Sequence, residues 1–196
     1  MKNTRDALAG VVAEFWCIPW LAKNYKNILP HEFGGYLDCR NKVDYFATEE
    51  NDADYLLDTK ASIEHPNILI ETDHPAFSPG NLARGHRGFV LPFKDFPEIL
   101  VVRSTIWFKH LLEQRAEKKT FSSREVYVVT RDVIVRSYHS PRNVKTIATD
   151  ESFGHFFDRN YPFKSNPIAG MSEEQIKEYA NTTIKHLCLN NDILDE

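Results

Sequence analysis

Two carboxylates and one ammonium group interrupt short apolar stretches between residues 42 and 62. Asp44 lies in KVDYF, while Asp58 and Lys60 lie in LLDTK, and the acidic segment TEENDAD joins the two stretches. Aspartate is unfavourable in strands, and a buried carboxylate needs a partner to offset its desolvation. Pairing the stretches as a hairpin would bring Asp44 and Asp58 together, where their like charges repel. These carboxylates therefore need a compensating positive charge.

A divalent cation is the simplest source of that charge. Carboxylate oxygens suit Mg²⁺ or Mn²⁺, which typically take one or two protein carboxylates and complete their shell with water and phosphate. Asp58 and Lys60 are two residues apart, so on a strand both side chains point to the same face. An ammonium group placed there could stabilise a developing oxyanion or help to activate water. The spacing thus predicts a Mg²⁺ or Mn²⁺ site with a lysine beside it.

This arrangement resembles the PD-(D/E)xK nuclease superfamily, which has an aspartate on one strand and an acidic-x-Lys triplet on the next. The matching residues are Asp44 and Asp58-Thr59-Lys60, and Val43 stands where the family has proline. The resemblance covers roughly residues 5 to 138. It implies a restriction-endonuclease-like core and metal-dependent hydrolysis of phosphodiester bonds, with Asp44 and Asp58 holding the metal and Lys60 orienting or activating the attacking water.

Further acidic ligands are implied by the same resemblance. NILIETD is similar to a strand of phage and resolvase-like members, which places Glu71 at the site as a catalytic and metal-binding residue. The family's other common acidic ligand comes from the first helix, which makes Glu14 the candidate, with Glu32 or Asp38 as substitutes.

A competing register of the motif uses Asp54 and the triplet Glu71-Thr72-Asp73. It has aspartate where the family has lysine, so the register with Lys60 is preferred. Glu71 belongs to the site in both registers. Of the eight histidines, none forms a paired metal-binding motif, but His74 follows Glu71 and Asp73 and is expected at the edge of the same site.

Two locally basic segments are expected to contact the nucleic-acid backbone through guanidinium groups and backbone N–H groups. An ordinary solvated loop is the alternative for the first segment. The predicted contacts are Arg84, His86 and Arg87 in NLARGHRG, and Arg131, Arg136, Arg142 and Lys145 in TRDVIVRSYHSPRNVK, which also contains Tyr138 and His139.

The composition limits the class of protein. The chain has 196 residues and a net charge of −4, which favours one globular domain over residues 1–196 and argues against binding of nucleic acid by bulk charge alone. Three separated cysteines indicate neither a disulfide framework nor a zinc site. We find no signal peptide and no membrane span in the sequence, which predicts a cytoplasmic, intracellular protein, with a viral or mobile-element setting suggested by the phage-like strand.

The elements that must position these residues follow from periodicity and turn signals. We expect an α/β (α+β) fold, with a central mixed β-sheet that contains an antiparallel meander and is flanked by helices. Helices are predicted at 4–25, 104–119 and 172–190. Three or four meander strands are predicted among 34–40, 42–48, 54–62 and 67–73, a loop at 75–88, and further strands at 89–93, 98–104 and, as a pair, within 124–139.

The sequence therefore predicts a metal-dependent nuclease, with DNA ahead of RNA as the substrate. Cutting both strands of a duplex would need a homodimer or two successive encounters. The alternative is a non-catalytic binding module of the same fold, such as an acidic DNA mimic or an inhibitor of a host protein, and a third reading is a structural or virion-associated protein. Nucleotide-binding loops and serine-hydrolase motifs are absent from the sequence.

Overall fold

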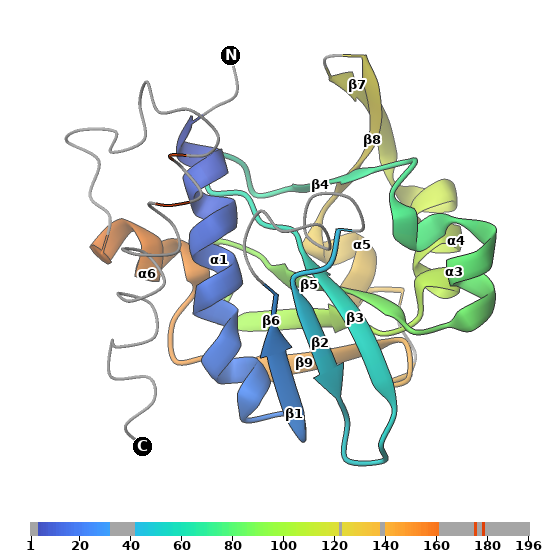
Figure 1. The fold of residues 1–196 in the computed structure, drawn as a ribbon. Coiled ribbons are helices and arrows are strands. Elements are labelled where there is room, and N and C mark those ends of the chain that lie inside the picture. Colours follow the sequence, from blue (N-terminus) through green and yellow to red (C-terminus); the bar gives the residue numbers. More distant parts are fainter. Residues whose placement is uncertain are drawn as a thin grey trace.

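The computed structural model describes residues 4–31, 42–121, 123–137 and 140–160, together with 175 and 178. Strands and helices alternate irregularly along these residues, as Figure 1 shows. The helices are α1 (Thr4–Ala22), the 3₁₀ turn η1 (Pro75–Phe77), α3 (Pro79–Arg84), α4 (Thr105–Arg115), α5 (Arg131–Val135) and α6 (Phe153–Asn160). The strands are β1 (Asn27–Pro30), β2 (Tyr45–Thr48), β3 (Asp54–Thr59), β4 (Ile68–Glu71), β5 (Arg87–Pro92), β6 (Glu98–Val102), β7 (Glu117–Phe121), β8 (Arg124–Val129) and β9 (Val144–Ala148).

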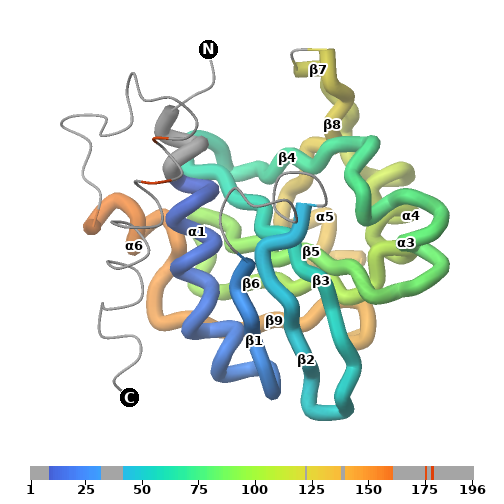
Figure 2. The backbone as a smooth tube through the Cα atoms, in the orientation of Figure 1, coloured from blue at the N-terminus to red at the C-terminus, as the bar shows by residue number. Residues whose placement is uncertain are grey.

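The strands form two sheets. The larger sheet has the order β1-β2-β3-β5-β6-β9, and the smaller one has the order β4-β8-β7. Within the larger sheet only β3 and β5 are parallel, and the other neighbours are antiparallel. The trace in Figure 2 shows the chain leaving β3 for β4 and returning through α3 to β5. This excursion is the connection that allows β5 to run parallel to β3.

The larger sheet separates two hydrophobic clusters. Val90 of β5 faces α1 and α6, whereas its neighbours Phe89 and Leu91 face the smaller sheet, α4 and α5. This alternation follows from the two-residue period of a strand that is covered on both faces. Trp16 of α1 packs against Phe153 of α6 with ring centroids 5.4 Å apart, and the two helices lie side by side in Figure 1. The protein is thus a mixed α+β fold with a mixed sheet flanked by helices.

Several predicted elements are confirmed. An N-terminal helix is present and continues three residues past Pro19, whose missing N–H falls close to the helix end. The helix at 105–115 begins with Ser104 as N-cap, whose side chain accepts a hydrogen bond from the backbone N–H of Trp107. β2 and β3 form the predicted antiparallel hairpin, with Tyr45 opposite Leu57.

The predicted meander is partly wrong. The stretch 67–73 does contain a strand, β4, but it pairs with β8 in the smaller sheet and not with β3. The third strand of the meander is β1, which was not predicted. The predicted strand at 34–40 lies outside the described residues, as does the predicted closing helix at 172–190 apart from residues 175 and 178.

Other segments differ from the predictions because tertiary packing overrides local propensity. The expected loop at 75–88 holds η1 and α3, and Arg87 already begins β5. The second strand expected in 124–139 is replaced by the helix α5, which Thr130 caps by accepting from the backbone N–H of Val133. The predicted helix at 104–119 ends at Arg115, and 117–121 is the strand β7. Neither β9 nor α6 was predicted. Among the described residues, no helix is long and apolar enough to span a membrane.

Candidate active site

Asp58 and Lys60 meet at the end of β3. In the parallel register Asp58 lies beside Phe89, and both side chains therefore face the smaller sheet. Asp58 is 4% exposed, which is rare for a carboxylate without a partner. Its Oδ2 lies 2.8 Å from Nζ of Lys60, whose side chain is 16% exposed. The same-face geometry predicted from their spacing is present as a largely buried ion pair.

Asp44 joins this end of β3 from the neighbouring strand. It directly precedes β2, where Tyr45 points to the α1 side of the sheet, so the side chain of Asp44 points to the side of Asp58. Its Oδ2 accepts a hydrogen bond of 2.5 Å from the backbone N–H of Thr59, the residue between Asp58 and Lys60. The carboxylate of Asp44 therefore anchors the strand segment that carries the other two groups.

Glu71 and His74 reach the same place from the smaller sheet. Oε2 of Glu71, at the end of β4, lies 3.8 Å from Nζ of Lys60. Nε2 of His74 lies 3.3 Å from Oδ2 of Asp58, and the histidine side chain is 1% exposed. Nδ1 of His74 accepts a hydrogen bond from the backbone N–H of Ala76 in η1, so in the neutral ring the proton is on Nε2, facing Asp58.

The imidazole of His74 has a fixed orientation. Its ring packs against Phe89 at 4.9 Å and against Phe77 at 6.0 Å between centroids. The 3₁₀ turn that supplies Phe77 and the Nδ1 hydrogen bond begins at the next residue. Because the ring is packed and its Nδ1 is hydrogen-bonded to the backbone, Nε2 of His74 is directed at Asp58. A histidine fixed in this way can hold a carboxylate in one orientation.

Arg87 is a second cation on this side of the sheet. It is buried at the start of β5, in line with Phe89, and its guanidinium donates to the backbone carbonyl of Lys42 at 3.5 Å. Burial lowers the pKa of Arg87, and the charge of Asp58 opposes that effect. The sequence placed Arg87 on a phosphate-binding loop, but the structure places it in the wall of the cluster.

The charges of the cluster stabilise one another. Burial by itself would raise the pKa of Asp58, but the ammonium of Lys60 and the imidazole of His74 outweigh it and hold that pKa below its usual value. Burial by itself would lower the pKa of Lys60, but Asp58, Glu71 and Asp44 outweigh it and raise that pKa well above its usual range. Both groups of the Asp58–Lys60 pair are therefore charged at neutral pH.

The donor atoms of the cluster decide whether it could hold a divalent cation. Oδ2 of Asp58, Oε2 of Glu71 and Nε2 of His74 are buried. Their close polar contacts are Asp58 to Nζ of Lys60 at 2.8 Å, Glu71 to Nζ of Lys60 at 3.8 Å, and His74 to Asp58 at 3.3 Å. Within the described part of the chain, no three His, Cys, Asp or Glu side chains are grouped closely enough to hold a metal. Any divalent cation held here would therefore take at most two ligands from the described side chains, and water or phosphate would complete its coordination. A cation on Oδ2 of Asp58 would require Lys60 to move.

The other predicted acidic ligands lie elsewhere. Glu14 is on α1, which packs on the opposite face of the sheet, and its backbone carbonyl accepts a hydrogen bond from the hydroxyl of Tyr45. The structure thus does not bring Glu14 to the cluster. Asp54 is exposed at the start of β3 and accepts from the hydroxyl of Thr48, so the competing register does not assemble. Glu32 and Asp38 lie outside the described residues.

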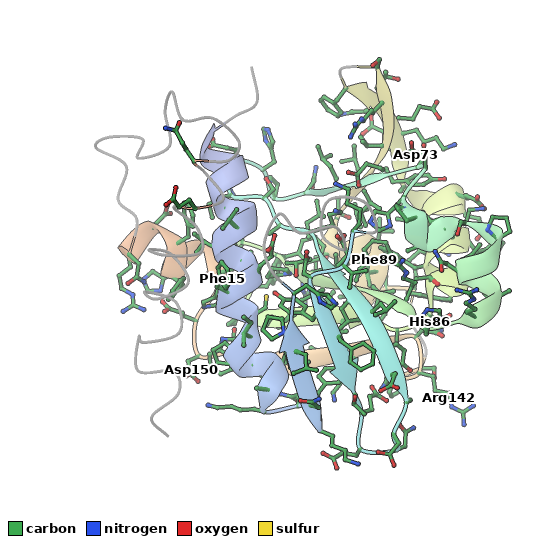
Figure 3. The ribbon with its side chains drawn as sticks, viewed as in Figure 1. Phe15, Asp73, His86, Phe89, Arg142 and Asp150 are labelled. Atoms are coloured by element: carbon green, nitrogen blue, oxygen red, sulfur yellow. The ribbon has the colours of Figure 1, made fainter. Side chains whose placement is uncertain are left out.

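Three of the predicted nucleic-acid contacts are exposed. Arg84 ends α3, Arg136 follows α5 and pairs with Asp132 at the surface, and Arg142 lies before β9. Figure 3 shows Arg142 at the edge of the molecule, well separated from Phe89, which marks the cluster. These three arginines do not line the Asp58 cluster.

Two of the remaining predicted contacts, Arg131 and Lys145, are held by other groups of the protein. Arg131 pairs with Glu98 and lies over the ring of Phe96, 4.2 Å from its centroid. Lys145 donates from Nζ to the backbone carbonyl of Asn24 at 2.6 Å. His86 is half-buried beside β5. Tyr138 and His139 lie outside the described residues.

Comparison with known proteins gives no relative. No protein-family model matches the chain, and searches of curated proteins and of solved structures found no significant match. The chemistry of the cluster must therefore be argued from its own geometry.

Proposed function

We propose that this protein is a metal-dependent nuclease with a restriction-endonuclease-like, PD-(D/E)xK-type core. The observation that carries the proposal is the convergence of Asp44, Asp58, Lys60 and Glu71 on one end of β3, where carboxylate oxygens of Asp58 and Glu71 are buried. The three carboxylates of Asp44, Asp58 and Glu71 lie near two cations, Lys60 and Arg87, so the charges of these five groups sum to −1. A divalent cation and a phosphodiester would complete the site.

Each side chain has a role in this proposal. Asp58 and Glu71 would hold Mg²⁺ or Mn²⁺, while Asp44 keeps the end of β3 in place through the N–H of Thr59. Such a cation supplies Lewis acidity toward the phosphoryl oxygen and makes water a better nucleophile at neutral pH. Lys60 would place its ammonium beside the developing negative charge, and His74 would orient Asp58.

The wider setting is also part of the proposal. The substrate is nucleic acid, with DNA ahead of RNA, and the exposed Arg84, Arg136 and Arg142 would contact its backbone. A homodimer would allow both strands of a duplex to be cut. The protein would act inside a host cell, in a viral or mobile-element setting.

The test is cleavage by purified protein of plasmid, linear duplex and RNA in Mg²⁺, Mn²⁺ or EDTA. We expect cleavage only with metal, and a loss of at least about 100-fold in Asp58→Asn and Lys60→Ala, since removing one group aimed at transition-state charge typically costs that much. Asp54→Asn is the matched control, because it removes an exposed carboxylate from the same strand. Cleavage that continues in both site variants would refute the assignment of the site.

A non-catalytic binding module is the second candidate, and two observations favour it. The described residues contain no three-ligand metal group, and Lys60 already lies close to both Asp58 and Glu71, where a cation would have to bind. The hairpin between β2 and β3 also exposes Glu50, Asp52 and Asp54, which could mimic a nucleic-acid backbone. Absence of metal-dependent cleavage on every substrate, together with unchanged thermal stability in Mn²⁺, would favour this candidate over the nuclease.

A further inference from the structure

A small cavity lies between α4 and the segment that follows α5. Its volume is about 140 Å³. An engineered, enclosed cavity of about 150 Å³ binds benzene. This hollow is partly open to solvent, so it has room for a single ring or a single phosphate group, and the rest of a larger ligand would lie outside it. The polar and aromatic side chains that line it are Trp107, His110, Gln114, Arg115, Arg136 and Ser137.

The lining is cationic. Arg115 comes from the last turn of α4, and Arg136 follows the last residue of α5. Among the described residues that line the cavity there is no Asp or Glu. Both arginines lie at helix C-termini, where each offsets the partial negative charge of the helix end. Asp132 offsets the charge of Arg136, but among the described residues no carboxylate pairs with Arg115, so the cavity keeps an excess of positive charge that attracts an anion.

Neither arginine is firmly held by the protein. Arg115 donates to the hydroxyl of Ser137 at 3.4 Å, which is a long contact. Arg136 pairs with Asp132 at 3.1 Å, but both side chains are mostly exposed, and pairs of that kind contribute little. A phosphate group could take both guanidinium groups with stronger, charge-assisted hydrogen bonds.

Trp107 is the aromatic side chain of the cavity lining. It is half-buried at the cavity, and Arg115 lies two turns further along α4. Stacking of bases on aromatic side chains, next to cationic groups that hold the backbone, is a common way to bind nucleotides. The combination of one indole and two guanidinium groups selects for a ligand with an aromatic ring and a phosphate.

We infer that this cavity binds the phosphate group of a nucleotide, with the base against Trp107. None of its lining residues belongs to the Asp58 cluster, so the inference goes beyond the proposed nuclease site. The phosphate could belong to a free mononucleotide or to a polynucleotide backbone. If the ligand is a polynucleotide, the cavity gives the proposed nuclease an additional contact with its substrate, and this version of the inference rests on the proposed function. Binding of a free mononucleotide does not depend on it.

Tryptophan fluorescence tests this inference directly. The chain has three tryptophans, and Trp16 and Trp20 are buried against α1 neighbours and α6, away from the cavity. We would titrate the protein in EDTA with thymidine 5′-monophosphate, with thymidine, with inorganic phosphate and with an oligothymidylate. EDTA prevents metal-dependent cleavage, so binding is measured whether or not the Asp58 cluster is catalytic.

We expect a saturable change with the monophosphate that is absent in Trp107→Phe and is displaced by inorganic phosphate. Arg115→Gln and Arg136→Gln should each weaken binding about tenfold or more, as expected for the loss of a charge-assisted hydrogen bond. Lys109→Gln, which removes a cation of α4 outside the cavity, should bind normally. Tighter binding of the oligothymidylate would identify a polynucleotide as the ligand, and equal binding a mononucleotide.

Three results would overturn the inference. One is the absence of any saturable change that depends on Trp107. Another is binding of thymidine as tight as that of its monophosphate, which would show that the phosphate contributes nothing. The third is an equal loss in Lys109→Gln and in the arginine variants, which would indicate general charge attraction and no defined site. All substituted side chains are at least partly exposed, and thermal unfolding would verify that each variant is folded.

Discussion

Replacement of Lys60 by methionine should destabilise the protein by about 3 kcal/mol at pH 7, because it leaves buried carboxylates without their cation. Nζ lies 2.8 Å from Asp58 and 3.8 Å from Glu71. At an effective dielectric constant of about 20, unit charges at those distances attract by roughly 6 and 4 kcal/mol. Desolvation of each ion offsets several kcal/mol of this attraction. The side chain of Lys60 is 16% exposed, so we expect a value at the lower end for broken buried pairs.

Urea unfolding of a double-mutant cycle measures this effect. The parent, Lys60→Met, Asp58→Asn and the double variant should show a coupling free energy of about 2 kcal/mol or more, since the two groups are in contact. Lys119→Met is the control, because its pair with Glu117 at 3.4 Å is largely exposed and should contribute only about 0–1 kcal/mol. A cost of Lys60→Met below about 1 kcal/mol, or additive single changes, would refute the buried-pair reasoning.

The pH dependence provides a second check on the same pair. The folded pKa of Asp58 is lowered, so its contribution is present above the unfolded value of about 3.9 and is lost as the pH falls through the folded value. The folded pKa of Lys60 is raised, so its contribution is present below about 10.4 and is lost as the pH rises through the folded value. Without Lys60, burial should raise the pKa of Asp58, and the cost of Lys60→Met should shrink on acidification toward about pH 4.

Three further predictions concern the scaffold. A Cβ on Gly88 would lie 2.4 Å from a backbone carbonyl oxygen of β6, so Gly88→Ala should lower the free energy of unfolding in urea by about 1–3 kcal/mol or more. Gly80→Ala is the control, because its Cβ would meet open space on a helix, and it should be neutral or stabilising. Ser104→Ala removes the cap on the N–H of Trp107 and should lower stability by about 1 kcal/mol, with Ser104→Asp restoring it. Burial raises the pKa of Tyr25, so above about pH 10 the tyrosine loses its proton in the unfolded chain while it stays protonated in the folded one. This difference favours unfolding, and the melting temperature should therefore fall more steeply from pH 9 to 11 in the parent than in Tyr25→Phe.

The sequence was sufficient for the local half of the candidate site. Alternation in a strand places Asp58 and Lys60 on one face, and a short acidic turn between two apolar stretches favours the hairpin that brings Asp44 to the same end. Helical periodicity likewise predicted a helix at 104–119, and the structure has one at Thr105–Arg115. These features depend on residues close together in the chain, so their geometry follows from backbone period and turn chemistry.

Tertiary structure alone decided which other groups meet them. Glu71 reaches Lys60 because β4 pairs with β8, more than fifty residues later, and no local signal distinguishes that pairing from a fourth strand of the meander. His74 and Arg87 enter the cluster through η1 and β5, while Glu14 is turned to the opposite face by the packing of α1. Sequence pattern specifies which face of an element is apolar, but the partner of each face is chosen by long-range burial of apolar surface.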